Sequence, residues 1–341
     1  DPFVDSRLWQ QCRLPKMPYD PTKAPNGIRM TIGMKSMPGR KGYGEGHGTH
    51  ADRAILDGDM KHLRMLIGDD CELYADFFKR EETKPVEPMT RRGDCPTVEV
   101  HIVCFNEELI LPYTLRHYQT FAAKIIIHDG GSTDRSKEIA KEYGAEVRDW
   151  DTNGEINDTL LKRLKETAWL GTPADWVIMV DADELIYFPD HPTNSLKQYE
   201  QQKLAFVKPR GFEMESPELP AGDGQIYEEI RHGAPDDKWY AKPVLFSPKR
   251  VKSIDYMVGA HECKAVLHSG LKMITPVRFS QPPCYLLHYH HIGSVERIGA
   301  KYDANRKRFS KENKEHNWGW NGDGLRHARD KRAYILARRQ E

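Results

Sequence analysis

Between residues 98 and 181, short apolar runs alternate with amphipathic stretches, and this alternation restricts the possible folds more than any other feature of the chain. The apolar runs have the length and composition of buried strands and occupy residues 98–105, 124–128, 145–148 and 176–180. The stretches between them have helical spacing and occupy residues 106–121, 136–143 and 156–169. Strands that alternate with helices form a mostly parallel sheet with helices on both faces. The predicted fold class is therefore α/β.

The regions on either side of this segment have a different character. Residues 1–50 are rich in Pro, Gly and Met, which predicts an irregular arm; residues 51–80 have helical spacing. After residue 189 several short strands are expected, followed by a long charged helix from about Val295. The predicted organisation has three parts: an N-terminal arm and helical segment (1–96), a catalytic α/β domain (97–295) and a basic C-terminal helical extension (296–341).

The composition is that of a soluble globular protein, with 38% hydrophobic and 30% charged residues. No stretch approaches the roughly 18 consecutive apolar residues that a membrane helix requires, so no membrane span is expected. The start of the sequence has neither a basic segment nor an apolar one typical of a signal peptide. The six cysteines are scattered without a CxxC pair, which favours reduced thiols. A cytoplasmic location is favoured, although the sequence leaves the compartment unknown.

The net charge is zero, but basic and acidic residues are unevenly distributed along the chain. Residues 1–50 carry 8 basic and 4 acidic side chains, and residues 297–341 carry 13 basic and 6 acidic ones. Basic ends of this kind attract anionic partners, although a solvated basic helix gives the same pattern. His47 and His50, in the glycine-rich part of the arm, lack a nearby third ligand and are a weak metal candidate.

The sharpest chemical signal is the pair of carboxylates in Asp181-Ala182-Asp183, directly after the buried run Trp176–Val180. Acids at i and i+2 on an extended strand share one face, where their oxygens suit Mn²⁺ or Mg²⁺. Such a cation can neutralise the charge of a departing diphosphate. A turn or helix cap would use the same residues, but the position at the end of a predicted parallel strand favours a metal.

A second polar segment, Asp129-Gly130-Gly131-Ser132-Thr133-Asp134, follows the second predicted strand. A carboxylate at this position can accept hydrogen bonds from a base or ribose, and glycines permit close approach of a ligand. The same residues can form a strand-to-helix turn in which Thr133 or Asp134 caps the next helix. The two roles are compatible.

Taken in order, these motifs resemble the family 2 glycosyltransferases of the GT-A fold. The resemblance rests on segments 104–108 (CFNEE), 117–118 (HY), 128–134 (HDGGSTD) and 181–184 (DADE), and it covers about residues 97–300. It implies a Rossmann-like, mostly parallel sheet flanked by helices. The N-terminal arm and the C-terminal helix lie outside it.

The resemblance also implies roles for individual residues. Asn106, Glu107, Asp129 and Asp181 are expected to bind the nucleotide-sugar donor, and Asp181 and Asp183 to hold the metal with the diphosphate. Gly130 stands where many relatives have a second acid, which affects the contacts to base and ribose. A UDP-sugar is the favoured donor.

A late histidine often completes the metal site in GT-A enzymes, and His288 in Leu286-Leu287-His288-Tyr289-His290-His291 is the candidate. Strand alternation predicts that His290 shares the face of His288 and that His291 lies on the opposite face. In general, a histidine at such a position is more often structural than a ligand.

An inverting transferase needs a base that takes the proton of the acceptor hydroxyl. In this family the base is an acid well downstream of the paired aspartates, and Gly259-Ala260-His261-Glu262 supplies two candidates. We expect His261 or Glu262 to act as the base, with Asp151 and Asp158 as weaker alternatives.

The predicted function is transfer of a sugar from a nucleotide-sugar donor to a hydroxyl acceptor, with Mn²⁺ or Mg²⁺ as cofactor and inversion at the sugar. The acceptor can be a glycan, a protein or a nucleic acid; the basic ends, with Trp318 and Trp320 among basic residues, are compatible with a polyanion. Three alternatives remain: a nucleotidyltransferase, a nucleic-acid-modifying sugar transferase and a non-catalytic nucleotide-sugar-binding module. The acidic Glu107-Glu108 disfavours the first, and the intact aspartate pair disfavours the last.

Overall fold

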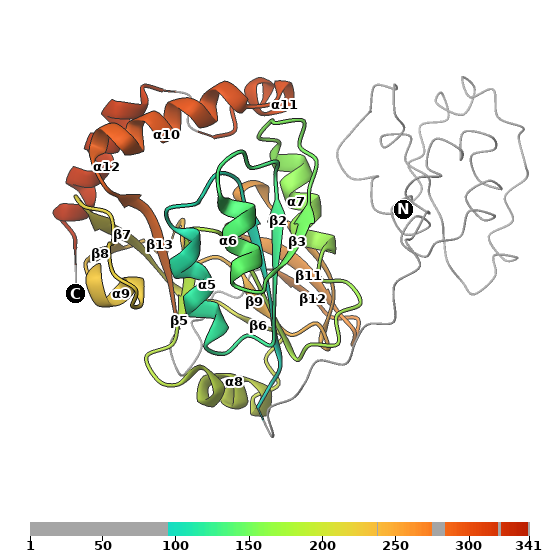
Figure 1. The fold of residues 1–341 in the computed structure, drawn as a ribbon. Coiled ribbons are helices and arrows are strands. Elements are labelled where there is room, and N and C mark those ends of the chain that lie inside the picture. The colour runs from blue at the N-terminus through green and yellow to red at the C-terminus, as the bar shows by residue number, and fades with distance from the viewer. Residues whose placement is uncertain (1–94, 237, 275–283, 320–321, 340–341) are drawn as a thin grey trace, which may run out of the picture. The chain divides into compact units, whose positions relative to one another are not determined.

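The computed structural model describes residues 95–236, 238–274, 284–319 and 322–339 (Figure 1). The predicted N-terminal arm, the helical segment 51–80 and the histidines His47 and His50 lie outside the described residues, as does Trp320. Among the described residues, no helix is both long and apolar enough to cross a membrane.

A six-stranded sheet forms the centre of the described region, in the order β3-β2-β1-β4-β9-β6. Its members are β1 (Val98–Cys104), β2 (Lys124–Asp129), β3 (Glu146–Asp149), β4 (Trp176–Asp181), β6 (Phe206–Val207) and β9 (Leu245–Phe246). The first four strands are parallel, and β9 pairs antiparallel with both β4 and β6. The predicted mostly parallel α/β sheet is confirmed.

Four helices follow or flank these strands: α5 (Leu111–Gln119), α6 (Ser136–Glu142), α7 (Asp158–Thr167) and α8 (Pro192–Gln201). The predicted helix 106–121 begins only at Leu111. The backbone N–H groups of Asn106, Glu107 and Glu108 donate instead to side chains of the 132–136 segment, so the chain before α5 forms a loop.

A second sheet lies beside the first and has the order β5-β13-β7-β8. Its strands are β5 (Glu184–Tyr187), β13 (Tyr285–Ile292), β7 (Arg210–Ser216) and β8 (Gly233–Pro235), and α9 (Ile226–Glu229) precedes β8. A third sheet contains β10 (Val251–Tyr256), β11 (Cys263–Leu267) and β12 (Lys272–Ile274), with the short helix η4 (Val258–Ala260) between β10 and β11. The turn between β4 and β5 therefore connects the first two sheets, and it contains Ala182 and Asp183.

Helix α5 fixes this turn. The Thr114 hydroxyl donates to the Ala182 carbonyl (2.5 Å), and the Tyr118 hydroxyl donates to the Glu184 carbonyl (3.0 Å). The His117 ring donates to the Ile186 carbonyl (2.9 Å). The His117-Tyr118 pair thus acts as a buried anchor for the strand that follows the two aspartates.

The described C-terminal region contains three helices, α10 (Val295–Arg308), α11 (Lys311–Glu315) and α12 (Gly324–Leu336); the charged helix begins at Val295, as predicted, and ends at Arg308. Phe309 is extended (ψ 128°), which ends α10, and Ser310 caps α11 by accepting from the Asn313 N–H. Helices α10 and α12 pack closely at two glycines: a Cβ on Gly324 would lie 2.3 Å from the Gly299 carbonyl oxygen. Figure 1 shows these helices along one edge of the described region.

Candidate functional site

The strand register brings the predicted site residues to one edge of the central sheet. Cys104 pairs with Asp129, and Val103 pairs with Asp181 on the other side of β1. Because β1, β2 and β4 are parallel, the residues after each strand meet at the same carboxyl edge. Asn106, Asp129 and Asp181 therefore share one region although 75 positions separate the first from the last.

The loops after β1 and β2 are joined by hydrogen bonds. Asn106 has a left-handed backbone (φ 53°), and its side-chain oxygen accepts from the Thr133 N–H (2.7 Å). The Asp134 carboxylate accepts from the N–H groups of Glu108 and Ser136, the second of which begins α6. Asn106 and Asp134 thus hold the loops after β1 and β2 together.

Asp129 is buried (1% exposed), and one of its carboxylate oxygens is fully engaged. Oδ2 accepts from the N–H groups of Gly131 and Ser132, both at 2.9 Å, and Lys137 lies 3.4 Å from it. Oδ1 is buried without a hydrogen-bond partner among the described residues. A turn needs only the first oxygen, so the second is available to a ligand that carries a donor group.

Asp181, at the end of β4, lies among ammonium groups. Its Oδ1 is 2.7 Å from Lys165 Nζ, and its Oδ2 is 3.6 Å from Lys242 Nζ. Lys242 also pairs with the buried Glu184 (2.5 Å). Burial raises the pKa of Asp181 and the two lysines lower it, and the net shift is downward. Asp181 is therefore ionised and engaged on both oxygens.

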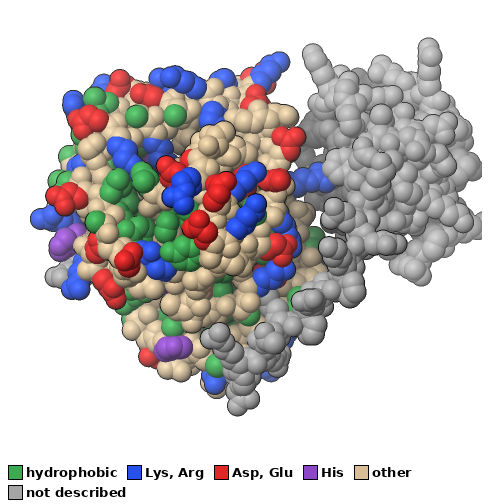
Figure 2. Space-filling view, in the orientation of Figure 1, with side chains coloured by type: hydrophobic (Ala, Val, Ile, Leu, Met, Phe, Trp, Pro, Cys, Tyr) green, Lys and Arg blue, Asp and Glu red, His purple; other side chains and the backbone are tan. Residues whose placement is uncertain are grey.

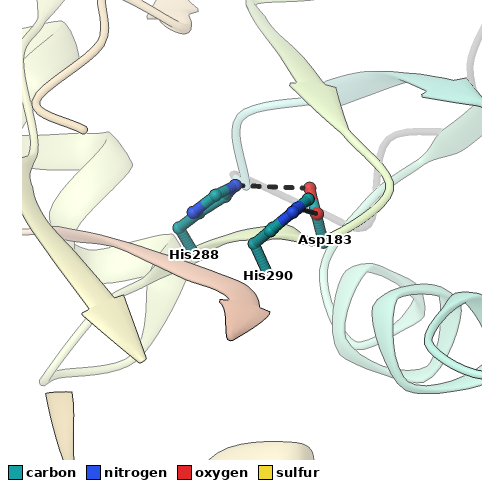
Figure 3. A group of neighbouring side chains, drawn as sticks. All are labelled: Asp183, His288 and His290. Carbon is teal, nitrogen blue, oxygen red and sulfur yellow. Dashed lines mark hydrogen bonds and ion pairs between the residues drawn. The ribbon is translucent and has the colours of Figure 1, made fainter. Parts of the chain in front are cut away.

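Asp183, two residues later, lies among imidazoles instead (Figure 3). Its Oδ1 is 3.6 Å from His288 Nε2, and its Oδ2 is 3.1 Å from His290 Nδ1. Candidate ligand atoms of the three residues all lie within 4.8 Å of one another. Both rings come from β13, and they stack nearly parallel, at an angle of 10°.

A buried carboxylate orients the histidines. Glu213 Oε1, on β7, is 2.9 Å from His288 Nδ1 and 3.1 Å from His291 Nδ1. This bond leaves His288 Nε2 directed at Asp183. The predicted placement of His291 on the opposite face from His288 is wrong, because the pairing register between β13 and β7 shifts between these two residues and both rings reach Glu213.

The electrostatics of the cluster follow from its buried charges. Burial lowers the pKa of His288, but Glu213 and Asp183 raise it more, to about 9. Burial raises the pKa of Asp183, but His288, His290 and Lys301 bring it well below its usual range. Burial and the nearby Lys301 lower the pKa of His290 to about 3, so this ring is neutral.

These donors fit a divalent cation. One carboxylate and two imidazole nitrogens are ligands that Mn²⁺ and related metals accept. His290 Nε2 is buried without a hydrogen-bond partner among the described residues, and Glu213 holds His288 as carboxylates behind metal-bound histidines commonly do. Of the predicted ligands, the structure brings Asp183 and His288 together, adds His290, and places Asp181 with the lysines.

Helix α10 contributes a third lysine near the aspartate pair, after Lys165 and Lys242. Lys301 Nζ is 2.6 Å from Glu107 Oε1 and 3.7 Å from Asp183 Oδ2. Farther along the same helix, the Arg308 guanidinium lies over the Phe105 ring, 3.2 Å from its centroid. The C-terminal extension thus reaches the loop after β1.

The candidate bases occupy different surroundings. His261 Nδ1 donates to the Trp239 carbonyl (2.6 Å), which leaves Nε2 with the lone pair. Burial and the positive charge of Lys242 lower the pKa of His261 to about 4. The neighbouring Glu262 is exposed. Asp151 is exposed and accepts from the Asn153 N–H, and Asp158 is half-buried and accepts from Asn313 (2.6 Å).

Comparison with known proteins finds a family match for the segment that contains most of the central sheet. The profile of glycosyl transferase family 2 matches residues 99–232. This match supports a family 2-like glycosyltransferase domain in this part of the chain. No curated protein sequence matches the chain.

Solved structures of glucosyl-3-phosphoglycerate synthase from Mycobacterium tuberculosis are similar over a limited region. The complex with Mn²⁺, UDP and glucosyl-3-phosphoglycerate is 21% identical, with a TM-score of 0.25; the match covers 35% of this chain and 44% of that one. The complex with Mg²⁺ and UDP has the same values. The match thus spans less than half the length of these proteins.

Several residues of the family 2 domain and its surroundings were not among the predicted site residues: His290, Glu213, Lys165, Lys242 and Lys301. Strand alternation placed His290 beside His288 and could have identified it. The other four reach the site from β7, α7, the segment before β9 and α10, and no local motif marks them.

Proposed function

We propose that this protein is a metal-dependent glycosyltransferase that moves a sugar from a nucleotide-sugar donor to a hydroxyl acceptor. The observation that carries the proposal is the grouping of Asp183, His288 and His290 beside the carboxyl edge of the family 2 domain. A metal-binding group at this edge lies where ligands of open α/β sheets bind.

We assign donor binding to Asn106, Glu107, Asp129 and Asp181. The partnerless, buried Oδ1 of Asp129 can accept a hydrogen bond from the base or ribose. The Asn106 side chain accepts from the Thr133 N–H and so fixes the loop after β2. A UDP-sugar remains the favoured donor.

We assign metal binding to Asp183 and His288, with His290 as a further ligand and Asp181 on the donor side of the site. When bound, Mn²⁺ or Mg²⁺ would neutralise charge on the departing diphosphate. Glu213 orients His288, while Lys165 and Lys242 keep Asp181 ionised and fixed at the end of β4.

For an inverting transfer, the acceptor oxygen forms a bond to the anomeric carbon while the bond from that carbon to the diphosphate oxygen breaks. The proton of the acceptor hydroxyl passes to a base. His261 is our first choice, because the bond from Nδ1 to the Trp239 carbonyl leaves a lone pair on Nε2; Glu262 is the alternative.

We keep a glycan, a protein and a nucleic acid as candidate acceptors. Figure 2 shows basic side chains interspersed with acidic ones on the viewed face of the described region.

A hydrolysis screen tests the proposal. Each common nucleotide sugar is incubated with the protein and Mn²⁺, and release of the nucleoside diphosphate is measured. We expect release from one donor class, its loss on chelation, and its loss in the Asp183→Asn variant. If no donor is hydrolysed or bound with Mn²⁺ or Mg²⁺, the proposed function is wrong.

A further inference from the structure

Lys301 occupies an unusual position for a residue outside the family 2 domain. It lies on α10, 69 positions beyond the end of the matched segment, yet its ammonium contacts two of the motifs of that domain. Nζ is 2.6 Å from Glu107 Oε1 and 3.7 Å from Asp183 Oδ2. Its side chain is 23% exposed, so most of it is enclosed.

The surroundings of this ammonium are strongly charged. Glu107 and Asp183 face it from the loop after β1 and from the β4–β5 turn, and Arg297 and His290 lie nearby. Burial lowers the pKa of Lys301, but the two carboxylates raise it more, so the amine keeps its proton. Lys301 therefore places a permanent positive charge beside the Asp183 oxygen that faces His290.

We propose that Lys301 binds the diphosphate of the donor. Before a cation binds, the Lys301 ammonium neutralises the negative charges of Asp183 and Glu107. The inference rests on the proposed function, because it requires donor and cation to meet at Asp183. It assigns to α10, and not to the family 2 domain, a contact with the leaving group. Lysine ammonium groups are common phosphate ligands that act as point charges.

The proposal predicts two effects of opposite sign. A cation at Asp183 is repelled by the ammonium a few ångströms away, whereas a diphosphate there is attracted by it. Removal of the charge should therefore strengthen binding of a metal ion alone and weaken binding of a diphosphate. A lysine that only holds α10 against the loop would weaken both, because its loss would loosen the site.

Calorimetry on the full chain can separate these outcomes. Mn²⁺ alone is titrated first, and then UDP, GDP, ADP and dTDP are each titrated in the presence of Mn²⁺, into the wild type, Lys301→Met and Lys301→Arg. We expect Lys301→Met to bind Mn²⁺ several-fold more tightly and the preferred diphosphate about ten- to a hundredfold more weakly. Lys301→Arg, which keeps the charge, should resemble the wild type. Lys314→Met, at an exposed lysine of α11, is the matched control and should change neither value.

A double-mutant cycle excludes a role limited to neutralising Glu107. If Lys301 serves only Glu107, the Lys301→Met effect on diphosphate binding should vanish in the Glu107→Gln background; if it binds phosphate, the effect should persist. The inference is overturned if Mn²⁺ and diphosphate affinities fall together, if diphosphate affinity is unchanged, or if the effect vanishes in that background. If the wild type binds neither Mn²⁺ nor any diphosphate, the proposed function itself fails.

Discussion

Asp181 and Asp183 are two residues apart at the end of one strand, and the structure gives them opposite surroundings. Asp181 faces the ammonium groups of Lys165 and Lys242, whereas Asp183 faces the rings of His288 and His290. An ammonium has no lone pair and can only compete with a cation, but a neutral imidazole can share the cation with the carboxylate. Of the two acids in this short motif, Asp183 is therefore the better placed to bind a cation, and Asp181 is held by two lysines.

The histidines near the two aspartates also differ, in the direction in which their pKa values are shifted. On the Asp183 side, Glu213 and Asp183 outweigh burial and raise the pKa of His288 to about 9. On the Asp181 side, burial and Lys242 lower the pKa of His261 to about 4. The first ring is held as a cation between two carboxylates, so a metal ion that binds there must displace its proton, whereas the second ring stays neutral.

The largest effect is expected for Asp183→Asn. The amide removes the only carboxylate among the three grouped ligands, so transfer should be abolished, corresponding to a loss of several kcal/mol in the transition state. His288 retains Glu213 and Lys301 retains Glu107, so thermal unfolding should change little. Full transfer by this variant with Mn²⁺ present would contradict the assignment of Asp183 to the metal.

Asp181→Asn, in contrast, should lower the stability of the fold. It leaves the buried ammonium of Lys165 without its carboxylate, and breaking a buried pair costs about 3–5 kcal/mol. Because Asp181 is one-third exposed, we expect about 3 kcal/mol or less, measured as the free energy of unfolding in denaturant. Equal destabilisation by Asp181→Asn and Asp183→Asn would remove the distinction between the two acids.

His261→Ala tests the proton acceptor on the Asp181 side. We expect transfer to fall by about a hundredfold or more, while Mn²⁺ and donor affinities remain unchanged, because only acceptor activation is lost. Glu262→Gln is the matched variant at the neighbouring exposed position and should retain transfer. If Glu262→Gln loses transfer and His261→Ala does not, the base is Glu262; if both retain it, Asp151 and Asp158 become the candidates.

Asp129→Ala should weaken donor binding and affect the metal little. A lost hydrogen bond to a charged acceptor costs about 1.5–3 kcal/mol, which calorimetry with the nucleoside diphosphate can measure. Thermal unfolding must be followed in parallel, because the Gly131 and Ser132 N–H groups also lose their acceptor. An unchanged donor affinity would show that Asp129 serves only the turn.

The smallest expected effect is a change in pH dependence. Because His261 has a folded pKa of about 4, it should stay unprotonated, and transfer should persist, at pH values below the ordinary imidazole pKa of about 6.5. Lys242→Met removes one cause of the low pKa, so the acid limb of the rate profile should move upward in pH. Titration of His261 by NMR checks the shift directly, and an unmoved pKa would contradict the electrostatic account.

Much of the α/β framework could be predicted from local patterns. The strands β1, β2 and β4 coincide with apolar runs bounded by polar loops, and their parallel order follows from the helices between them. Helix ends were predicted less well. Helix α5 starts late because the preceding N–H groups bond to the next loop, and Phe309 and Ser310 divide the expected C-terminal helix.

By itself, the sequence determined which chemistry is present: two aspartates after a buried strand, a turn with Asp129, and a late group of histidines whose alternation pairs His288 with His290. Tertiary structure alone decided which partner each group has. Glu213, Lys242 and Lys301 reach the aspartates from distant elements, and a register shift brings His291 to Glu213. Charge interactions act across a few ångströms of space irrespective of separation along the chain, so the environments that distinguish Asp181 from Asp183 arise only when the chain has folded.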